Sequence, residues 1–244
     1  MSRFFVDPAA VGENTILIDG EDVRHITKVL RLKEGDRIEV SDSGEWEYSC
    51  EIVSMSSSMI GAKIIDKQRF AREPEIKVTL FQGVPKGSKM EQVVQKCTEL
   101  GVHEIVPVFM TRSVVTDNGK YGRKIIRYNS IAMEAAKQCR RGIVPLVQEA
   151  IYSEDVPPLL DDYDLVLFPY ENENELTIKD ALHDLKEKPK SIAVIIGPEG
   201  GFSEEEAGRF TFSGAVSVSL GETILRTETA GPAAVAMCMY ELEL

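Results

Sequence analysis

The sequence lacks several features that define particular classes of protein. It contains no apolar run of membrane-spanning length, and its first ten residues, MSRFFVDPAA, do not have the pattern of a signal peptide. We therefore expect a cytoplasmic protein with no membrane partner. The four cysteines lie far apart and form no C-x-x-C pair, which gives no indication of a metal site or a disulfide framework. We expect them to be reduced core residues.

An excess of positive charge, which is common in nucleic-acid-binding proteins, is also absent. The chain has 28 Lys and Arg residues against 40 Asp and Glu residues, and its net charge is -12. The acidity is unevenly distributed, with net charges of -3 in residues 1–72, +4 in residues 73–150 and -13 in residues 151–244. The overall charge therefore does not exclude a nucleic-acid partner for the first two regions.

Residues 1–72 have the pattern of a small β domain. Short alternating runs are separated by turn-forming DGED, KEGD, SDSG and SMSSS, which predicts a mostly antiparallel barrel or sandwich. Strands are expected at residues 15–18, 37–40, 46–52 and 60–65. EDVRHITKVLR at residues 21–31 predicts a short helix with one apolar and one basic side, and the charged residues 66–75 are interpreted as a linker.

From residue 73 onward, strand patterns alternate with long helical patterns, which predicts an α/β domain with a mainly parallel sheet. Strands are expected at residues 76–82, 104–110, 143–148, 165–168, 192–196 and 216–220. Helices are expected at residues 123–141, 175–187, 203–210 and 229–242. Another helix is expected to start at Ser88, in a capping box with Glu91, and to stop at Gly101.

The glycine-rich stretch IGPEGG, residues 196–201, follows an apolar strand and precedes SEEE. It has neither the lysine of a Walker motif nor the spacing of the dinucleotide fingerprint. Ser203 and Glu206 form a predicted capping box, so the following carboxylates already occupy the positive end of the helix dipole. Taken alone, this stretch is interpreted as a tight turn followed by a well-capped helix.

A second glycine loop changes this interpretation. LGETILRTETAGPAA, residues 220–234, also leaves a strand and enters a helix, which is apolar and rich in small residues. Two such turns in one parallel sheet place two sets of backbone groups at its carboxyl edge, where α/β sheets bind ligands. We expect them to hold a flat heterocycle, with Glu199 favouring a cationic ligand over an anionic one.

Together these motifs carry a resemblance. IGPEGGFSEEE followed by LGETILRTETA resembles the C-terminal signature of the RsmE family, SPOUT-type methyltransferases that act on N3 of a uridine in 16S ribosomal RNA. The resemblance continues through KMEQVVQKCTELGVHEIVPV, TRSVV and HITKVLR, and so covers most of the chain. The chain departs from the family at Lys137-Gln138-Cys139-Arg140, where Glu-Gln often precedes the arginine, which puts the role of Gln138 in doubt.

The resemblance implies a fold that periodicity alone does not predict. It implies a deep C-terminal trefoil knot in residues 73–244 and an N-terminal PUA-like barrel in residues 1–72 that binds RNA. It also implies S-adenosylmethionine as cofactor, 16S rRNA of the 30S subunit as partner, and a homodimer. The matching cofactor positions are Phe168, Pro169, Tyr170, Gly197, Pro198, Glu199, Gly200, Gly201, Leu220, Gly221, Ile224, Leu225 and Thr227.

Methyl transfer to N3 requires loss of the N3 proton, because the nitrogen lone pair is not free in the neutral imide. Arg226 is the expected catalytic residue that stabilises the charge spread over O2 and O4, although an ion pair with Glu222 or Glu228 is an equal alternative. Glu199 and Glu228 are candidate bases. Proximity without a dedicated base is an alternative.

The expected RNA contacts are basic residues whose sign and clustering suit phosphate. They are Arg3, Arg24, His25, Lys28, Arg31, Arg112, Arg123, Arg127, Arg140 and Arg141. Other functions remain open, namely a SPOUT enzyme with another RNA target, a ribose 2'-hydroxyl acceptor, and a non-catalytic RNA-binding or assembly protein. In a paired or stacked region the target base would have to be turned out.

Overall fold

A computed structural model describes residues 2–70, 73–117 and 119–243. The chain forms two compact units, one made of residues 1–73 with 136–144 and the other of residues 74–135 with 145–244. The predicted boundary at residue 72 divides the chain into two continuous domains. It therefore misses segment 136–144, which returns to the first unit. The sequence predicted a helix and a strand there.

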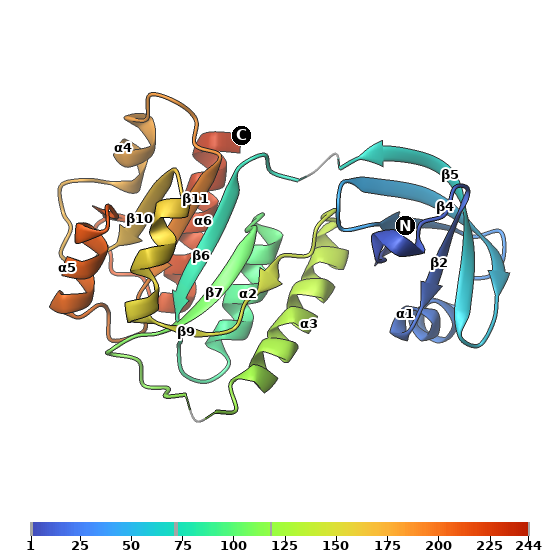
Figure 1. The fold of residues 1–244 in the computed structure, drawn as a ribbon, viewed down its shortest axis with the longest axis horizontal. Helices are drawn as coiled ribbons and strands as arrows, with labels where there is room; N and C mark the ends of the chain where they lie inside the picture. Colours follow the sequence, from blue (N-terminus) through green and yellow to red (C-terminus); the bar gives the residue numbers. More distant parts are fainter. Residues whose placement is uncertain (1, 71–72, 118, 244) are drawn as a thin grey trace. The chain divides into compact units, whose positions relative to one another are not determined.

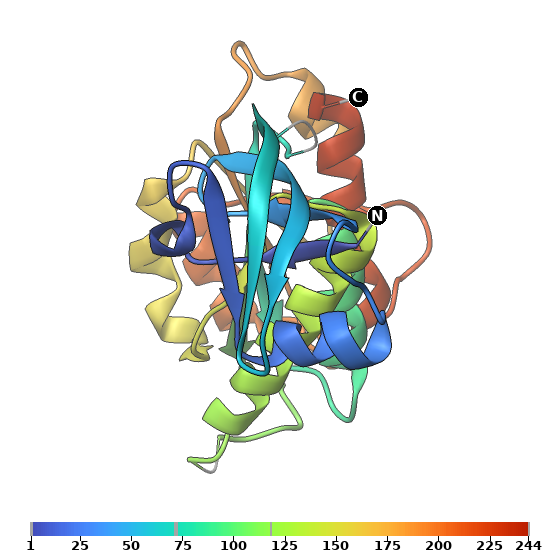
Figure 2. The same cartoon turned by 90° about the vertical axis from the view of Figure 1, so that its right-hand side faces the viewer.

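The first unit is built on a five-stranded sheet in the order β1-β3-β4-β5-β2. The pairs of β2–β5, β3–β4 and β4–β5 are antiparallel, while β1 and β3 are parallel, so the prediction of a mostly antiparallel arrangement is confirmed. Figure 2 shows this unit facing the viewer. Pairing between β1 and β2, which would close a barrel, is absent from the described ranges. The strands are β1 (Arg3–Phe5), β2 (Thr15–Asp19), β3 (Arg37–Ser41), β4 (Trp46–Met55) and β5 (Met59–Arg69).

Two predictions for this unit need correction. The expected helix at 21–31 is α1 (Glu21–Arg24) followed by a π-helical turn, η2 (His25–Val29), because backbone bonding widens after the first turn. The expected linker begins too early, since β5 continues to Arg69 in pairing with β4. Residues 71 and 72, also assigned to the linker, lie outside the described residues.

Segment 136–144 is part of the first unit because it is bonded to the sheet. The Ser41 hydroxyl donates to the Gly142 carbonyl at 2.5 Å. The Phe70 ring lies so close to Gly142 that a Cβ there would be 2.5 Å from a ring carbon, which explains why this position is a glycine. The strand predicted at 143–148 is reduced to β8 (Leu146–Val147), outside this segment.

The second unit contains a parallel sheet in the order β12-β10-β11-β6-β7-β8, with β9 also paired to β7 (Figure 1). Every pair in it is parallel, as predicted. The central strands are almost entirely buried, as expected for a sheet covered on both faces. The strands are β6 (Lys77–Gly83), β7 (Glu104–Phe109), β8 (Leu146–Val147), β9 (Ile151–Tyr152), β10 (Leu165–Pro169), β11 (Ser191–Ile196) and β12 (Val216–Val218).

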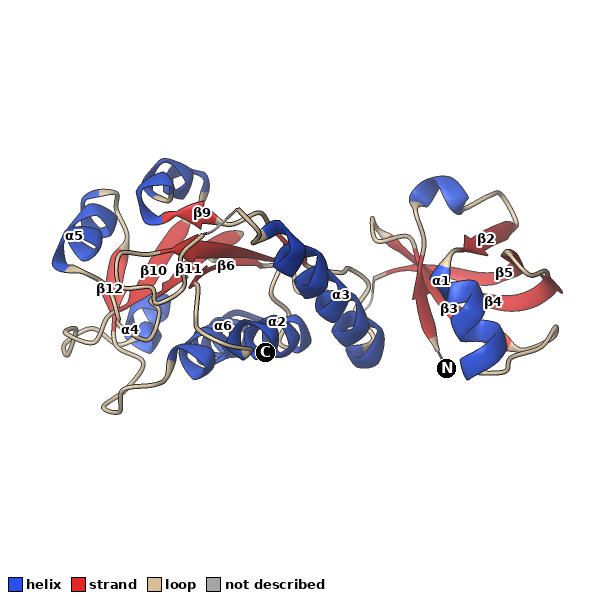
Figure 3. Cartoon of the chain, turned by 90° about the horizontal axis from the view of Figure 1, so that it is seen from below, coloured by secondary structure: helices blue, strands red, loops and turns tan. Residues whose placement is uncertain are grey.

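Helices cover both faces of this sheet (Figure 3). The last helix, α6, follows the edge strand β12 but packs against α2, α4 and the central strands β6 and β11. On the opposite face, α5 contributes Phe210 to an apolar core with Phe81 and Phe168. The helices are α2 (Lys89–Glu99), α3 (Gly122–Cys139), α4 (Ile178–His183), α5 (Glu204–Phe212) and α6 (Thr227–Glu243), with short 3-10 turns at η3 (Ser153–Asp155) and η4 (Pro157–Asp162). A further 3-10 turn, η1 (Pro8–Ala10), belongs to the first unit.

The predicted helix ends differ in their outcomes. The Ser203–Glu206 capping box forms with both reciprocal hydrogen bonds. The Ser88–Glu91 box does not form, because the Ser88 side chain makes no capping bond and its carbonyl accepts the Glu91 amide instead. Gly101 ends α2 at φ 97°, as the stop signal predicted. None of the helices in the described ranges has the length and apolarity needed to cross a bilayer.

Candidate functional site

A cavity of about 950 Å³ lies in the second unit, where β10, β11 and β12 end. Its wall is made by the loops that follow these three strands, together with the start of α2. The structure therefore brings the two glycine loops together at the carboxyl edge of the sheet. The predicted cofactor residues that line it are Pro169, Tyr170, Gly197, Pro198, Glu199, Gly200, Gly201, Leu220, Gly221, Ile224, Leu225 and Thr227.

One predicted cofactor residue, Phe168, has a different place. Its side chain is 1% exposed and packs edge-to-face against Phe202 and Phe210 in the core. It follows strand alternation, in which neighbouring side chains point to opposite faces. Phe168 therefore supports the loop from beneath and is removed from the cofactor-binding set.

The first glycine loop depends on small residues for two physical reasons. Gly201 has a φ of 67°, a conformation that residues with a Cβ rarely adopt. A Cβ on Gly200 would lie 2.8 Å from the Cβ of Arg112, so the loop after β7 packs directly against it. The Arg112 guanidinium also donates to the Gly200 carbonyl at 3.2 Å.

A buried hydrogen-bond relay joins the two glycine loops below the cavity. Gln82, at the end of β6, donates from Nε2 to the Thr227 hydroxyl at 2.8 Å. Thr227, the first residue of α6, in turn donates to the Gly197 carbonyl at 2.7 Å. Gln82 is fully buried, and its Oε1 has no hydrogen-bond partner within the described chain. The relay fixes the carbonyl of the first loop relative to the start of α6.

A cluster of charges joins the same loops at the rim. Lys89 Nζ lies 3.0 Å from Glu199 Oε1 and 3.1 Å from Glu228 Oε2. Glu199 also accepts the Lys86 backbone amide at 3.1 Å. Glu228 Oε2 is buried and has no partner with hydrogen-bonding geometry, so its contact with Lys89 is an ion pair held by charge.

The cluster affects proton affinity at both carboxylates. Burial acts to raise the pKa of Glu199, but hydrogen bonds from Lys89 and from backbone amides outweigh it and hold the pKa below 4.5. The pKa of Glu228 is also lowered, since burial, which acts to raise it, is outweighed by a backbone hydrogen bond and by the charges of Lys89 and Arg226. The contacts with Glu199 and then with Glu228 raise the pKa of Lys89. Both carboxylates are therefore anions at neutral pH.

Arg226 also lines the cavity and is exposed. Within the described chain it makes no ion pair with Glu222 or Glu228, so that alternative is not seen. Glu171, Glu173 and Glu222 add further carboxylates to the lining. Hydrogen bonds from Ser217 and from the amides of the following residues lower the pKa of Glu173 to about 2, so it stabilises the loop after β10. The residues that the structure describes contain no cluster suited to a metal ion.

Glu206 positions a third loop beside the cavity. This fully buried carboxylate caps α5 and also accepts the Thr111 amide at 2.8 Å. Burial acts to raise its pKa, but bonds from Thr111 and Ser203 outweigh burial and lower it. The ionised Glu206 therefore holds the loop that carries Arg112 against Gly200.

Most of the expected RNA contacts are on the surface, and two are not. The exposed or half-exposed ones are Arg24, His25, Lys28, Arg31, Arg112, Arg123, Arg127 and Arg140. Among these, Arg127 pairs with Glu91 at 2.8 Å. The first four lie together on α1, η2 and the residues after them, as the basic side predicted for that segment requires.

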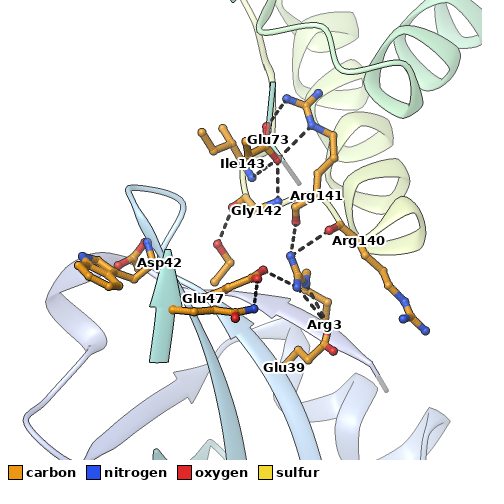
Figure 4. Close-up of polar contacts among 12 residues, drawn as sticks. Arg3, Glu39, Asp42, Glu47, Glu73, Arg140, Arg141, Gly142 and Ile143 are labelled. Atoms are coloured by element: carbon orange, nitrogen blue, oxygen red, sulfur yellow. Dashed lines mark hydrogen bonds and ion pairs between the residues drawn. The ribbon is translucent and has the colours of Figure 1, made fainter. Parts of the chain in front are cut away.

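Arg3 and Arg141 must be removed from the RNA-contact set because both are buried (Figure 4). The Arg3 guanidinium binds Glu47 at 2.7 Å and Glu39 at 3.2 Å, and donates to the carbonyls of Arg140 and Arg141. The Arg141 guanidinium binds Glu73 at 2.9 Å, while Glu73 also accepts the amides of Gly142 and Ile143. Both arginines therefore stabilise the first unit instead of facing a ligand.

The sequence reasoning missed Lys89, Gln82 and Glu171. Lys89 had a readable signal, because it starts a helix that directly follows strand β6 at the same sheet edge as the glycine loops. Gln82 had a weaker one, since it is polar at the end of an otherwise apolar strand.

Comparisons with known proteins agree with this geometry. A family model described as RNA methyltransferase domain matches residues 72–239, and one described as RNA methyltransferase PUA domain matches residues 18–60. The chain is 37% identical over 251 residues to the ribosomal RNA small subunit methyltransferase E of Bacillus subtilis (strain 168), with 100% of this chain and 98% of the relative covered.

Two solved structures are similar over the whole chain. A ribosomal RNA small subunit methyltransferase E from Neisseria gonorrhoeae bound to S-adenosyl methionine is 27% identical with a TM-score of 0.86, covering 98% of this chain and 97% of that one. A methyltransferase from Legionella pneumophila in complex with the cofactor SAM is 28% identical with a TM-score of 0.85, covering 98% and 96%.

Proposed function

This chain belongs to the ribosomal RNA small subunit methyltransferase E family, and from that premise we propose that it transfers a methyl group from S-adenosylmethionine to N3 of a uridine in 16S rRNA. The observation that carries the proposal is the cavity formed where the two glycine loops meet. Its volume of about 950 Å³ lies within the range of ligand pockets that enclose a small organic molecule.

The residues of the cavity fit this cofactor. The adenine is flat and uncharged, and it can lie against glycine backbone and the apolar side chains of Leu220, Ile224 and Leu225. The sulfonium and the amino group are cationic, and the lining offers Glu171, Glu199 and Glu222 as anions. When bound, the cofactor supplies a methyl group activated by the positive sulfur.

Arg226 is the residue that we assign to the developing negative charge on the uracil. The N3 proton must leave for the nitrogen lone pair to become available, and the resulting charge spreads over O2 and O4. An exposed guanidinium that is free of ion pairing with Glu222 and Glu228 can donate to those oxygens at the cavity mouth. Its pairing state favours this role over a structural one.

The charge cluster argues against Glu199 or Glu228 as the general base. A carboxylate whose pKa lies below 4.5 is a weak proton acceptor at neutral pH, and both are bound to Lys89. We infer that the N3 proton leaves to solvent, and that proximity and electrostatic stabilisation of the resulting anion supply most of the acceleration. Replacing both residues by Gln should then leave nearly the full single-turnover rate, measured at saturating cofactor, at every pH. A large loss of that rate would restore the carboxylate-base mechanism.

The RNA is proposed to bind both units. The first unit, in which residues 18–60 match the PUA domain model, presents Arg24, His25, Lys28 and Arg31 on α1, η2 and the residues that follow them. In the methyltransferase domain, residues 73–244, the exposed Arg112 lies directly against the first glycine loop. Phosphate contacts explain the sign of these side chains.

Three structural features complete the proposal. The α6 helix returns from the edge strand β12 to the centre of the sheet, which supports a C-terminal trefoil knot. The sheet of the first unit is proposed to curve into a barrel. Two copies are proposed to form a homodimer, since Tyr240 on α6 is 70% exposed. Light scattering at micromolar concentration would give twice the chain mass for a dimer and the chain mass for a monomer.

The methylation proposal is tested by offering labelled S-adenosylmethionine with 30S subunits, naked 16S RNA or tRNA, and identifying the modified nucleoside. The proposal expects 3-methyluridine in 16S rRNA. Label in tRNA or on a ribose 2'-hydroxyl would support another SPOUT activity, and absence of transfer with all three substrates would support a non-catalytic RNA-binding role. Arg226→Met should lower the rate by about a hundredfold while S-adenosylmethionine affinity stays unchanged.

A further inference from the structure

The rim cluster of Lys89, Glu199 and Glu228 joins three separate segments of the chain. Lys89 begins α2, Glu199 lies at the centre of the first glycine loop, and Glu228 follows the second loop as the second residue of α6. One ammonium group therefore contacts the first glycine loop and the start of α6, at 3.0 and 3.1 Å.

The burial of these groups distinguishes them from ordinary surface ion pairs. The side chains of Lys89, Glu199 and Glu228 are 21%, 21% and 15% exposed. The exposed pair Arg69–Glu45, by contrast, has side chains that are 73% and 55% exposed. Screening by water and salt is weaker where the groups are shielded, so the rim cluster is the kind of contact that can order a loop.

Charge balance makes Lys89 the central member. The two carboxylates meet the same ammonium, and Glu228 Oε2 has no hydrogen-bond partner in the described chain. The other nearby cations act differently, since Lys86 reaches Glu199 through its backbone amide and Arg226 affects Glu228 through charge alone. Without Lys89, two neighbouring carboxylates would repel each other across the rim.

We infer that Lys89 is a positioning residue for the cofactor. The ammonium group of Lys89 holds the two glycine loops in their binding arrangement through Glu199 and Glu228. The inference rests on the proposed S-adenosylmethionine site and deepens it. Lys89 acts through the carboxylates and need not touch the cofactor. Pre-ordering the loops strengthens binding because less ordering remains to be done when the ligand arrives.

The inference predicts that the effect of Lys89→Met on cofactor affinity depends on whether Glu199 and Glu228 are present. Lys89→Met should weaken S-adenosylmethionine binding by about tenfold or more when both glutamates are present. In a Glu199→Gln, Glu228→Gln background the same substitution should change affinity by less than about twofold, since no uncompensated carboxylate remains. Lys89→Arg should retain most of the affinity because it keeps the charge. Lys96→Met, on an exposed position of the same helix, is the matched control.

The experiment is calorimetric titration of each full-length variant with S-adenosylmethionine, together with methylation kinetics and urea unfolding. The expected kinetic result for Lys89→Met is a raised KM for the cofactor with kcat unchanged at saturation. Equal loss of affinity in both backgrounds would show direct contact and overturn the inference, as would unchanged affinity with lowered stability. Failure of the wild-type protein to bind the cofactor would instead overturn the proposed function.

Discussion

Each of the two units pairs cations with carboxylates, but the environments differ. In the first unit, Arg3 and Arg141 are 7% and 5% exposed and also serve backbone groups, either directly or through Glu73. In the second unit, Lys89 lines a cavity and, among the described residues, pairs with the side chains of Glu199 in the first glycine loop and Glu228 at the start of α6. Residues of similar charge therefore stabilise the fold in one place and line a cavity in the other.

Physical chemistry explains the difference. Removing one partner from a buried pair leaves a charge without water or a counter-ion, which strongly destabilises the folded state. A group at a cavity rim retains partial hydration, so its loss changes local order more than global stability. Substitutions in the two places should therefore separate stability from binding.

The largest effect is expected for Arg3→Met, which should lower the free energy of unfolding by about 3–5 kcal/mol. Glu47 and the carbonyls of Arg140 and Arg141 would lose a buried donor. Urea denaturation measures this change, with the exposed Arg123→Met as control. A loss below about 1 kcal/mol would remove the distinction between the two regions, because that is typical of surface pairs.

The next effect is expected for Thr227→Val, which keeps the side-chain shape but removes the hydroxyl of the relay. Gln82 Nε2 would lose one acceptor and the Gly197 carbonyl one donor. We expect a loss of about 1–3 kcal/mol in the free energy of unfolding, together with weaker cofactor binding. Thr227→Ser should retain both stability and affinity. Full stability and affinity in Thr227→Val would show that the relay positions nothing.

Much of this fold was predictable from sequence because local patterns and tertiary structure agree. Strand–helix alternation gave the parallel sheet, and the Ser203–Glu206 signature gave a real capping box. Burial of Arg3 and Arg141 was not predictable, because their partner carboxylates and carbonyls come from distant parts of the chain. Likewise, Ser88 and Glu91 match the sequence pattern of a capping box, but the Ser88 side chain makes no capping bond.

The candidate site was predictable to a similar extent. The paired glycine loops gave nearly all of the predicted lining, because glycine loops after parallel strands must meet at one edge. Phe168 was misassigned because side chains at a strand end point alternately toward the cavity and toward the core, and Phe168 points toward the core. The Lys89 contacts depend on how α2 meets α6, which spacing along the chain does not show.

A third, smaller effect tests whether burial, and not the unit, determines the role of a charge. Glu206 belongs to the second unit but is fully buried, so Glu206→Gln should destabilise the protein by about 1–2 kcal/mol at pH 7. Because the folded-state pKa is lowered from 4.5, the carboxylate contributes stability above that value. The difference from wild type should be constant from about pH 6 to 8 and shrink as pH falls below 4.5. A difference that grows on acidification would contradict this assignment.

The smallest effect is expected at a glycine outside both clusters. Gly208 lies within α5, and a Cβ there would meet nothing within 4 Å. Gly208→Ala should raise the free energy of unfolding by about 0.5–1 kcal/mol because it restricts the unfolded chain. Thermal unfolding measures this, and cofactor affinity should not change. Gly200→Ala, which would meet Arg112, should instead weaken binding.

The central claim, that the two glycine loops together form the cofactor site, is tested most directly by hydrogen exchange with and without S-adenosylmethionine. The account predicts that amides in residues 197–201 and 220–227 become protected in the bound protein, while the sheet of the first unit exchanges as before. Protection confined to one loop, or found only outside both, would contradict the claim.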